Sequence, residues 1–409
     1  MRSCVIVVEN LPVPFDRRVW QEAQALHADG WRVSVICPRT SRHPLAYEEI
    51  NGIAVYRHSL PFEARGRLGF VFEYVAALFH EFRLLIRVHR ERGFNVIQIC
   101  NPPDLLFLAA APWKLLGKKI VFDHHDICPE LFAAKFGKTI FLRRLMLALE
   151  WATFKVADVV VSTNESFREI AMRRGRKKPS DVVTVYSIPA KAMIRRTDPH
   201  PDVRAKASCI LGYLGIIGDQ DGVDHLVRML SHLVHERRCP DVHAVVVGDG
   251  PALASVRELA SSLEMDRHLT FTGYLSGDEL LTYLSSFDIG IVPDPPTEYN
   301  DKISMNKIFE YSALGIPSVA YPLAETKRLL GEAAIYAQDH TIPGLADACY
   351  QLIRDPAERA RRGQHAGELA ERKFNWAAEA SKYAAAYRRF ARNVPEQVVE
   401  TTEVIGPLP

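Results

Sequence analysis

The chain has 409 residues, of which 48% are hydrophobic and 24% are charged, and its formal net charge is +2 at pH 7. These proportions are those of a globular protein and exclude a mainly disordered, collagen-like or coiled-coil chain, and the nearly balanced charge does not indicate a nucleic-acid partner. A single hydrophobic core rarely serves more than ~250–300 residues, so the length predicts two domains.

The N-terminal half alternates short apolar runs with amphipathic segments, beginning with the continuous run CVIVV. Such runs are typical of parallel strands that are buried on both faces and joined by helices. Strands are predicted at residues 4–8, 33–37, 53–57, 96–100, 119–123, 159–163 and 182–186. Helices are predicted at residues 17–29, 69–92, 104–116, 137–156 and 165–174.

The C-terminal half repeats this alternation, so we predict an α/β protein with two doubly wound, Rossmann-like domains that face a central cleft. Ligands of such sheets bind at the carboxyl ends of the strands. Strands are predicted at residues 209–215, 243–248, 269–273, 289–293, 318–321 and 333–337. Helices are predicted at residues 222–235, 251–263, 277–285, 305–314, 325–330, 341–354, 356–372 and 376–391.

Residues 187–208 carry several prolines and no periodicity, which indicates a connection between domains. We place the first domain at residues 1–195, a linker at 196–208 and the second domain at 209–373. A C-terminal helix within residues 374–393 is expected to pack back on the first domain, and residues 394–409 are expected to be disordered.

Seven cysteines are scattered without a C-x-x-C pair, which favours reduced thiols in a cytoplasmic protein without a zinc site. The first apolar run ends at Glu9 and is too short for a signal peptide. No apolar stretch approaches the ~18 residues needed to cross a bilayer, so we expect a soluble or peripheral protein.

Glycines follow two strands of the second half. GYLGIIGDQDGVD places Gly215, Gly218 and Gly222 at one strand-to-helix turn, and VVVGDGP places Gly248 at the next. Glycine lets backbone N–H groups approach a phosphate, and a helix N-terminus adds a favourable dipole. The strict G-x-G-x-x-G spacing is absent, so ordinary tight turns remain an equal alternative.

The segment NDKISMNKIFEYSALGIPSVAYPLAET begins at Asn300 and contains a predicted helix start. A helix N-terminus with lysines suits an anion, and Glu310 one turn further could accept hydrogen bonds from a sugar diol. The alternative is a capped amphipathic helix with solvated charges. The helix start is flanked by Lys302 and Lys307, with Ser304 or Asn306 available as its cap.

This segment resembles the donor-site segment of the GT-B, family 4 glycosyltransferases. Residues 12–38, 123–136 and 161–175 look like members that build bacterial surface polysaccharides, and residues 213–226 resemble the donor-phosphate loop of one subgroup. The resemblance covers about residues 3–390.

The resemblance implies a retaining hexosyl- or N-acetylaminosugar transferase. Its donor would be a nucleotide diphosphate sugar, with UDP as the expected nucleotide, and its acceptor a lipid-linked saccharide or polysaccharide of the cell surface. No metal and no cofactor beyond the nucleotide-sugar co-substrate are expected. Because relatives often use lipid-linked acceptors, the resemblance also favours peripheral contact with the inner face of the cell membrane.

Carried onto this sequence, the resemblance assigns Glu310 to the ribose hydroxyls and His125 to a hydrogen bond near the reacting sugar. The alternative for His125 is a residue that organises a turn with Asp123 and Asp126. The implied donor-binding residues are Gly215, Gly218, Gly222, Gly248, Tyr274, Leu275, Lys302, Ser304, Met305, Asn306, Lys307 and Ile308. On the acceptor and phosphate side they are Arg17, Arg18 and Asp126, although arginines at a helix start are often solvated.

The sequence also departs from the family pattern. Lys302 stands where many members have a second glutamate, and Asp219 and Asp221 lie in the loop where many carry an Arg and a Lys. The usual Asn-Gly is missing from YSIPAK at residues 186–191. A non-catalytic GT-B scaffold and a nucleotide-sugar epimerase therefore stay open as alternatives.

Residues 69–93 form an amphipathic, basic segment that either packs on its own sheet or lies on an anionic membrane. Its apolar stripe comprises Phe70, Val71, Tyr74, Val75, Leu78, Phe79, Phe82, Leu85 and Ile86. Its basic flank comprises Arg83, Arg87, Arg90 and Arg92.

Overall fold

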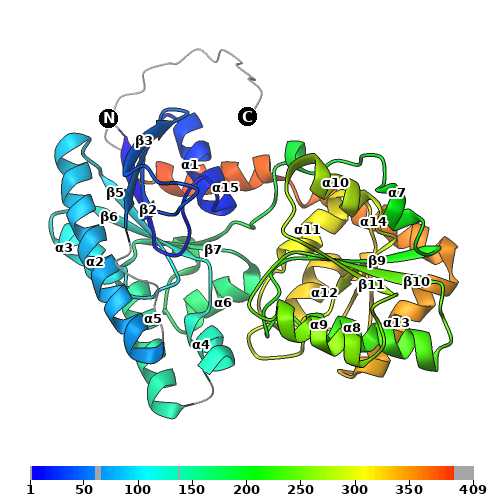
Figure 1. Cartoon of the computed structure of the whole chain (residues 1–409). Coiled ribbons are helices and arrows are strands. Elements are labelled where there is room, and N and C mark those ends of the chain that lie inside the picture. The colour runs from blue at the N-terminus through cyan, green and yellow to red at the C-terminus, as the bar shows by residue number, and fades with distance from the viewer. Residues whose placement is uncertain (1, 60–65, 137–138, 391–409) are drawn as a thin grey trace.

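The computed structural model describes residues 2–59, 66–136 and 139–390, and it contains two separate β-sheets flanked by helices (Figure 1). The first sheet has the strand order β3-β4-β2-β1-β5-β6-β7-β8. Its strands are parallel except for β3, which pairs antiparallel with β4. The strands are β1 (Ser3–Val8), β2 (Arg32–Pro38), β3 (Tyr47–Ile50), β4 (Ile53–His58), β5 (Val96–Cys100), β6 (Lys119–His124), β7 (Val159–Ser162) and β8 (Val182–Thr184).

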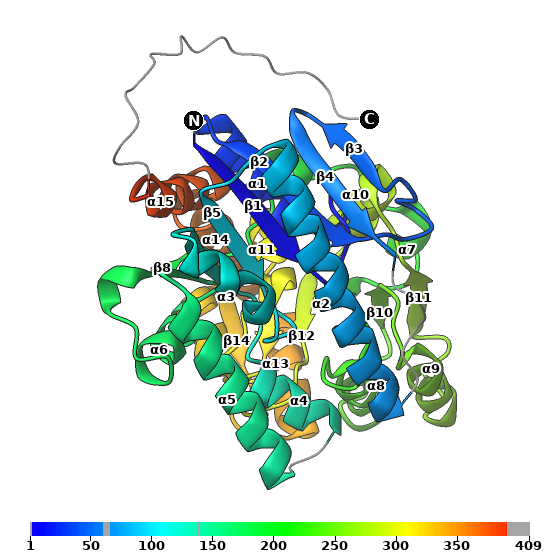
Figure 2. The same cartoon turned by 90° about the vertical axis from the view of Figure 1, so that its left-hand side faces the viewer.

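Helices cover both faces of this sheet. Helix α3 contacts both α2 and α5, and these three form an outer layer (Figure 2), while α1 packs against the C-terminal helix α15. The helices are α1 (Arg17–Ala28), α2 (Gly66–Glu91), α3 (Phe107–Leu115), α4 (Cys128–Phe136), α5 (Ile140–Val156) and α6 (Glu165–Arg173). We call β1–β8 with α1–α6 the first lobe.

The second sheet is wholly parallel, with the order β11-β10-β9-β12-β13-β14. Its strands are β9 (Cys209–Leu214), β10 (Val242–Val247), β11 (Leu269–Gly273), β12 (Ile289–Val292), β13 (Ser318–Ala320) and β14 (Ala334–Tyr336). The helices are α8 (Val223–Ser231), α9 (Leu253–Ser262), α10 (Gly277–Ser285), α11 (Asn306–Ala313), α12 (Ala324–Leu330), α13 (Ile342–Arg354) and α14 (Pro356–Arg372). We call β9–β14 with α8–α14 the second lobe.

Two short elements join the lobes in the chain. Helix α7 (Pro201–Arg204) lies between β8 and β9, and α15 (Trp376–Arg388) follows α14. Helix α15 packs on α1 and β8, so the last described helix lies against the first lobe (Figure 1).

The predicted fold class is confirmed, because each sheet is doubly wound around its first strand, β1 or β9. Strand β3 and the helices α4 and α7 were not predicted. Strand β3 forms a hairpin with β4 through Asn51 and Gly52, whose φ angles of 49° and 78° suit the Asn-Gly turn. Helix α4 precedes α5 in a region where the sequence predicts one helix from residue 137.

The predicted domain boundaries stay predictions. Residues 394–409, for which the sequence predicts disorder, lie outside the described residues. Helix α15 ends at Arg388, slightly before the predicted end.

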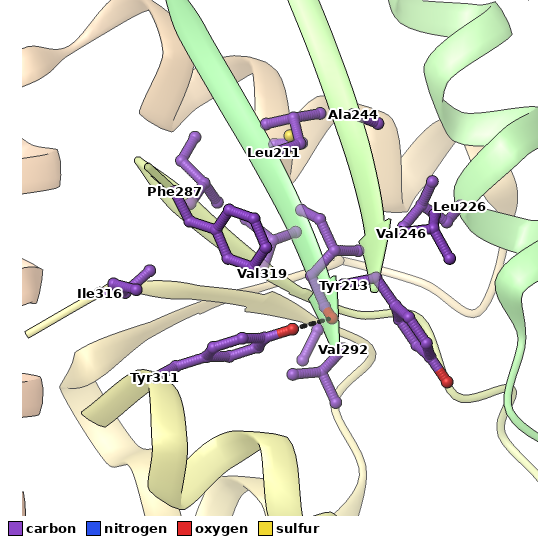
Figure 3. Close-up of a cluster of buried hydrophobic side chains, with 14 of the residues drawn as sticks. Leu211, Tyr213, Leu226, Ala244, Val246, Phe287, Val292, Tyr311, Ile316 and Val319 are labelled. Carbon is purple, nitrogen blue, oxygen red and sulfur yellow. Dashed lines mark hydrogen bonds between the residues drawn. The ribbon is translucent and has the colours of Figure 1, made fainter. Parts of the chain in front are cut away.

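Two glycines let aromatic rings lie flat on the second sheet (Figure 3). A Cβ added at Gly212 would lie 1.9 Å from the Phe287 ring, and one at Gly290 would lie 2.4 Å from the Tyr311 ring. The Tyr311 hydroxyl donates to the Gly212 carbonyl over 3.1 Å and accepts from the Leu214 N–H over 3.0 Å. These contacts fix α11, which carries Tyr311, against β9.

Gly212→Ala is expected to destabilise the protein by about 1–3 kcal/mol, because the added methyl overpacks a core without room to relax. Gly367→Ala in α14 is the matched control: among the described residues its Cβ would meet only Gly315 Cα, at 4.0 Å. Alanine there should stabilise by about 0.5–1 kcal/mol through lower backbone entropy in the unfolded chain. Urea unfolding measures both, and equal stability of the two variants would contradict this packing.

Candidate functional site

The two lobes meet through polar side chains from loops at the carboxyl ends of their strands. Arg17, the first residue of α1, donates from Nη1 to Glu310 Oε1 on α11 over 2.8 Å. Tyr299 of the second lobe donates from its hydroxyl to Asp126 Oδ1 over 2.7 Å. Three predicted site residues, Arg17, Asp126 and Glu310, therefore lie at one junction between lobes.

Arg17 and Arg18 are neighbours with opposite environments. Asp16 caps α1 by accepting from the Val19 N–H over 3.1 Å, and the Arg17 side chain stays 28% exposed. Arg18 turns inward, where it donates to both oxygens of Asp123: from Nη2 to Oδ1 over 2.7 Å and from Nε to Oδ2 over 3.2 Å. Its Nη1 donates to the Val185 carbonyl over 2.8 Å. The predicted phosphate contact therefore does not fit Arg18, since its donors are already bound inside the first lobe.

Asp123 is a fully buried carboxylate in contact with Arg18 and His125. Burial by itself raises its pKa, but the Arg18 guanidinium and the His125 ring hold the pKa of Asp123 well below its usual range. Glu22 also contacts Arg18, over 3.0 Å, and burial raises the pKa of Glu22 well above its usual range. The Arg18 guanidinium, which donates to both oxygens of Asp123, thus holds that carboxyl in its ionised form.

His125 lies at the edge of this network, with its side chain 13% exposed and its Nε2 in contact with Asp123 Oδ2. Asn101, directly after β5, fixes the turn: its Oδ1 accepts from the N–H groups of His125 over 2.7 Å and of Asp126 over 3.1 Å. Asn101 thus holds the backbone of this turn, and both predicted roles of His125 stay predictions. Asn101 was not predicted as a site residue, although its place after a strand and before Pro102 was a usable signal.

The predicted phosphate turns of the second lobe pack on one another. A Cβ at Gly248, whose φ is +142°, would lie 1.8 Å from the Gly215 carbonyl oxygen. The Gly215 N–H donates to the Val247 carbonyl over 3.1 Å, and the Gly218 N–H donates to Asp221 Oδ2 over 3.0 Å. Close turn packing thus accounts for Gly248, and phosphate contact by Gly215, Gly218, Gly222 and Gly248 remains a prediction.

Helix α11 begins without the predicted cap. Met305 occupies the N-cap position because the helix starts at Asn306, and none of the described side chains caps its first turn. Ser304 lies one position too early, and its buried hydroxyl finds no hydrogen-bond partner within the described part of the chain. The backbone N–H groups in the first turn of α11 therefore have no capping side chain among the described residues, which is what an anion site at a helix start requires.

Both predicted lysines have carboxylate partners. Lys307 is buried, and its Nζ lies 2.9 Å from Asp294 Oδ2 and 5.0 Å from the centre of the Tyr213 ring. Lys302 Nζ lies 3.6 Å from Glu130 Oε1 of the first lobe and 3.4 Å from Glu298 Oε1. The sequence analysis missed Asp294 and Glu130, because their pairing depends on the folded positions of separate loops.

The predicted base-binding residues follow β11. Tyr274 is 55% exposed, and the Arg42 guanidinium of the first lobe lies 5.7 Å from the centre of its ring. Leu275 is partly buried against the second core. Tyr274 therefore also lies where the lobes approach each other.

Cys100, Asp123 and His125 are the described residues whose donor atoms, all within 4.8 Å of one another, could hold a metal ion. The chemistry of the set does not favour a cation. Arg18 donates to both oxygens of Asp123, and burial raises the pKa of the Cys100 thiol well above its usual range.

Comparisons with known proteins agree with this architecture. The family model described as Glycosyltransferase Family 4 matches residues 16–187, and that described as Glycosyl transferases group 1 matches residues 208–355. An α-D-kanosaminyltransferase of Streptomyces kanamyceticus is 24% identical over 316 residues, which are 74% of this chain and 79% of that protein. A GDP-mannose-dependent α-(1-6)-phosphatidylinositol monomannoside mannosyltransferase of Mycolicibacterium smegmatis is 26% identical over 201 residues, 46% of this chain and 52% of that protein.

Solved structures share the fold at low sequence identity. A sucrose-phosphate synthase of Thermosynechococcus elongatus has a TM-score of 0.76 at 19% identity, covering 96% of this chain and 100% of that one. Anabaena HepE in complex with UDP and glucose has a TM-score of 0.71 at 14% identity, covering 95% and 100%.

Asp123→Asn is expected to destabilise the protein by about 3–5 kcal/mol at pH 7, because it leaves the Arg18 charge buried without its partner. The lowered pKa of Asp123 means that its ionised form stabilises the fold above the unfolded pKa of about 3.9 and that this contribution is lost at lower pH. The gap between variant and wild type should therefore be constant from pH 7 to about 4 and narrow below that.

Urea unfolding across this pH range measures the gap. Asp278→Asn is the matched control, because its 2.6 Å pair with Arg195 is exposed to solvent and should contribute no more than about 1 kcal/mol. Equal effects of the two substitutions would contradict the buried-pair account.

Proposed function

The chain belongs to the GT-B, family 4 glycosyltransferases, and from this premise we propose that it transfers a sugar, with retention of configuration, from a UDP-sugar to a lipid-linked or polysaccharide acceptor in cell-surface glycan synthesis. The observation that carries the donor assignment is the Arg17–Glu310 pair between the lobes. The complex of HepE with UDP and glucose supports a UDP-sugar, and the mycobacterial relative, named for a phosphatidylinositol mannoside acceptor, supports a lipid-linked acceptor.

In this proposal the Glu310 carboxylate accepts hydrogen bonds from the ribose diol of the donor, a role that suits an acceptor-only group. Binding of the diol releases Arg17, whose planar guanidinium then pairs with the diphosphate. This exchange supplies positive charge that the loop with Asp219 and Asp221 lacks. It also leaves Lys307 in its pair with Asp294.

The uncapped N-terminus of α11 supplies further donors to the diphosphate. The departing nucleotide diphosphate gains negative charge as the glycosidic bond breaks, and these fixed donors stabilise that charge more strongly than they stabilise the bound substrate. His125 is placed beside the reacting sugar as a hydrogen-bonding group, with no covalent step assigned to it. The acceptor hydroxyl then attacks from the face that the leaving group occupied and passes its proton to the departing diphosphate, and catalysis rests on positioning.

Glu310→Ala is expected to lower kcat/KM for the nucleotide sugar at least about a hundredfold, because two hydrogen bonds to a charged group are lost. Radiolabelled sugar transfer measures the rate, and circular dichroism checks the fold. Glu332→Ala, at a highly exposed glutamate of the second lobe, is the matched control and should transfer as the wild type does.

Undiminished transfer by the Glu310 variant would refute the donor site. Calorimetry of the wild type with UDP tests the scaffold alternative, which predicts no binding. Formation of an isomeric nucleotide sugar without acceptor would instead support the epimerase alternative.

The outer layer of the first lobe supports contact with a membrane that presents the acceptor. None of the described helices is long and apolar enough to cross a membrane. Phe79 on α2 and Phe141 on α5 are 60% and 77% exposed, and Leu115 on α3 is also exposed. Figure 2 shows these three helices on one face of the lobe. Among the described side chains of these helices, the other exposed large apolar residues are Val75, Leu108, Ile140, Leu145 and Trp151.

Basic side chains accompany this apolar surface. Arg83, Arg87 and Arg90 line a hollow of about 440 Å³ along α2. Leu85 of the predicted stripe is buried in the core, as packing on the sheet requires. Val75 and Phe79 are exposed, and we assign them to the membrane contact. Arginines beside exposed aromatic rings suit an anionic interface. The predicted stripe residues Phe70, Val71 and Tyr74 have side chains outside the described set.

The double variant Phe79→Ser/Phe141→Ser is expected to bind phosphatidylglycerol vesicles at least about tenfold more weakly, because each ring gives up about 1.5–3 kcal/mol of burial. Vesicle co-sedimentation measures binding. Met193→Ser, at an exposed apolar residue of the chain between the sheets, should bind as the wild type does. Equal binding by all three proteins, or none by the wild type, would contradict the membrane contact.

A further inference from the structure

Two tyrosines of α15 reach into the core of the first lobe. The Tyr383 hydroxyl donates to Gln98 Oε1 on β5 over 2.6 Å, and the Tyr387 hydroxyl donates to the same oxygen. Both rings and the glutamine are fully buried. Two hydroxyls of α15 therefore converge on one polar side chain of the first lobe.

The two hydroxyls determine which way the Gln98 amide faces. Both lone pairs of its oxygen are taken, so its Nε2 is directed at Glu22 Oε2, over 2.7 Å, and at Asp123 Oδ2, over 3.4 Å. A reversed amide would place its oxygen against the Asp123 carboxylate, and its NH₂ group would require both tyrosine hydroxyls to give up donation and accept instead. The tyrosines thus hold the donor side of Gln98 toward Asp123.

Asp123 connects Gln98 to His125, because its Oδ2 contacts both side chains. Because Asp123 is ionised, it can only accept, so the contact between its Oδ2 and the His125 Nε2 requires a proton on Nε2. When an imidazole with its proton on Nε2 is neutral, its Nδ1 is unprotonated and can accept a hydrogen bond. The orientation and the tautomer of His125 are both set by the carboxylate behind it.

We propose that Gln98, Tyr383 and Tyr387 are positioning residues that fix the tautomer and orientation of His125 through Asp123. The inference rests on the proposed function, in which His125 lies beside the reacting sugar. Helix α15 follows α14 of the second lobe and packs on α1 and β8 of the first, so the same helix that joins the lobes also sets the histidine.

The buried hydrogen bonds that link Tyr383 and Tyr387 to Gln98, and Gln98 to Asp123, differ from ordinary core packing. Each group stays satisfied only while its neighbour keeps one orientation, because an unpaired polar group in the interior is strongly unfavourable. An apolar residue at position 98 would fill the space without that requirement. The series of hydrogen bonds instead leads from α15 through Gln98 and Asp123 to His125, whose side chain is 13% exposed at the junction of the lobes.

The test uses Tyr383→Phe, Tyr387→Phe and the double variant of the full-length protein. Either hydroxyl alone still occupies Gln98 Oε1, so each single variant should keep kcat within about twofold. The double variant frees the amide, and kcat should fall about ten- to a hundredfold while donor KM is unchanged, because Glu310 and α11 are not touched. Gln98→Met should show the same loss, which keeps the test valid if the double variant folds poorly.

Tyr336→Phe is the matched control, because its hydroxyl donates to the Gly331 carbonyl over 3.1 Å within the second lobe. It should leave kcat unchanged. A general loss of stability would lower the melting temperature without the split between kcat and KM.

Two further readouts separate this inference from the proposed function. In a His125→Ala background the double tyrosine substitution should cause no additional loss of rate, since its effect passes through the missing ring. Nitrogen NMR of ¹⁵N-histidine-labelled protein, with the signal of His125 identified by its loss in His125→Asn, should show the Nε2–H form in the wild type and a mixture of tautomers in the double variant.

Full transfer by His125→Ala would refute the role of His125 in the proposed function, while the NMR result would still decide whether the tyrosines set its tautomer. A wild-type tautomer in the double variant, or an equal loss of rate with and without His125, would overturn the inference.

Discussion

The buried ion pair between Arg18 and Asp123 is the interaction on which the junction of the lobes depends. It joins the start of α1 to the end of β6, and the same guanidinium holds the Val185 carbonyl where the chain leaves β8. Two charges taken out of water stabilise a fold only when all their hydrogen bonds are met. Gln98 and His125 complete the set around Asp123.

The first turn of α1 carries both Arg18, which is buried in the first lobe, and Arg17, which lies at the junction of the lobes. Asp16 caps α1, which places Arg17 and Arg18 in its first turn with side chains pointing in different directions. Arg18 is fixed inside, and Arg17 extends to Glu310 on the other lobe. Because one rigid turn sets both, the pairing of Arg17 with Glu310 depends on the first-lobe core as well as on α11.

Much of the architecture could be predicted from the sequence, because continuous apolar runs and amphipathic helices alternate so regularly. The meeting of Arg17, Asp126 and Glu310 could be expected as well, since loops at the carboxyl ends of parallel strands share one edge. The hairpin of β3 was also within reach, through Asn51-Gly52.

Pairing across the fold was not predictable. Nothing local distinguishes Arg18 from Arg17, because the burial of one follows from the position of Asp123, more than a hundred residues away. Lys307 likewise reads as a free phosphate ligand until Asp294 is placed beside it. Met305 occupies the N-cap position of α11, one residue from the predicted Ser304 or Asn306, and helix starts are uncertain by that amount.

The electrostatics of the proposed donor site follow from these pairings. Lys302 and Lys307 near α11 are paired with carboxylates other than Glu310, whereas Arg17, which belongs to the opposite lobe, is paired with Glu310 itself. In the proposed function, donor binding and contact between the lobes are therefore linked. Glu310 exchanges a guanidinium for a ribose, and the guanidinium moves to the diphosphate.

A crystal structure of the protein with an unhydrolysed UDP-sugar analogue tests this exchange most directly. The account predicts the Glu310 carboxylate on the ribose hydroxyls, with Arg17 moved from that carboxylate to the diphosphate. An intact Arg17–Glu310 pair beside a donor bound elsewhere would contradict it.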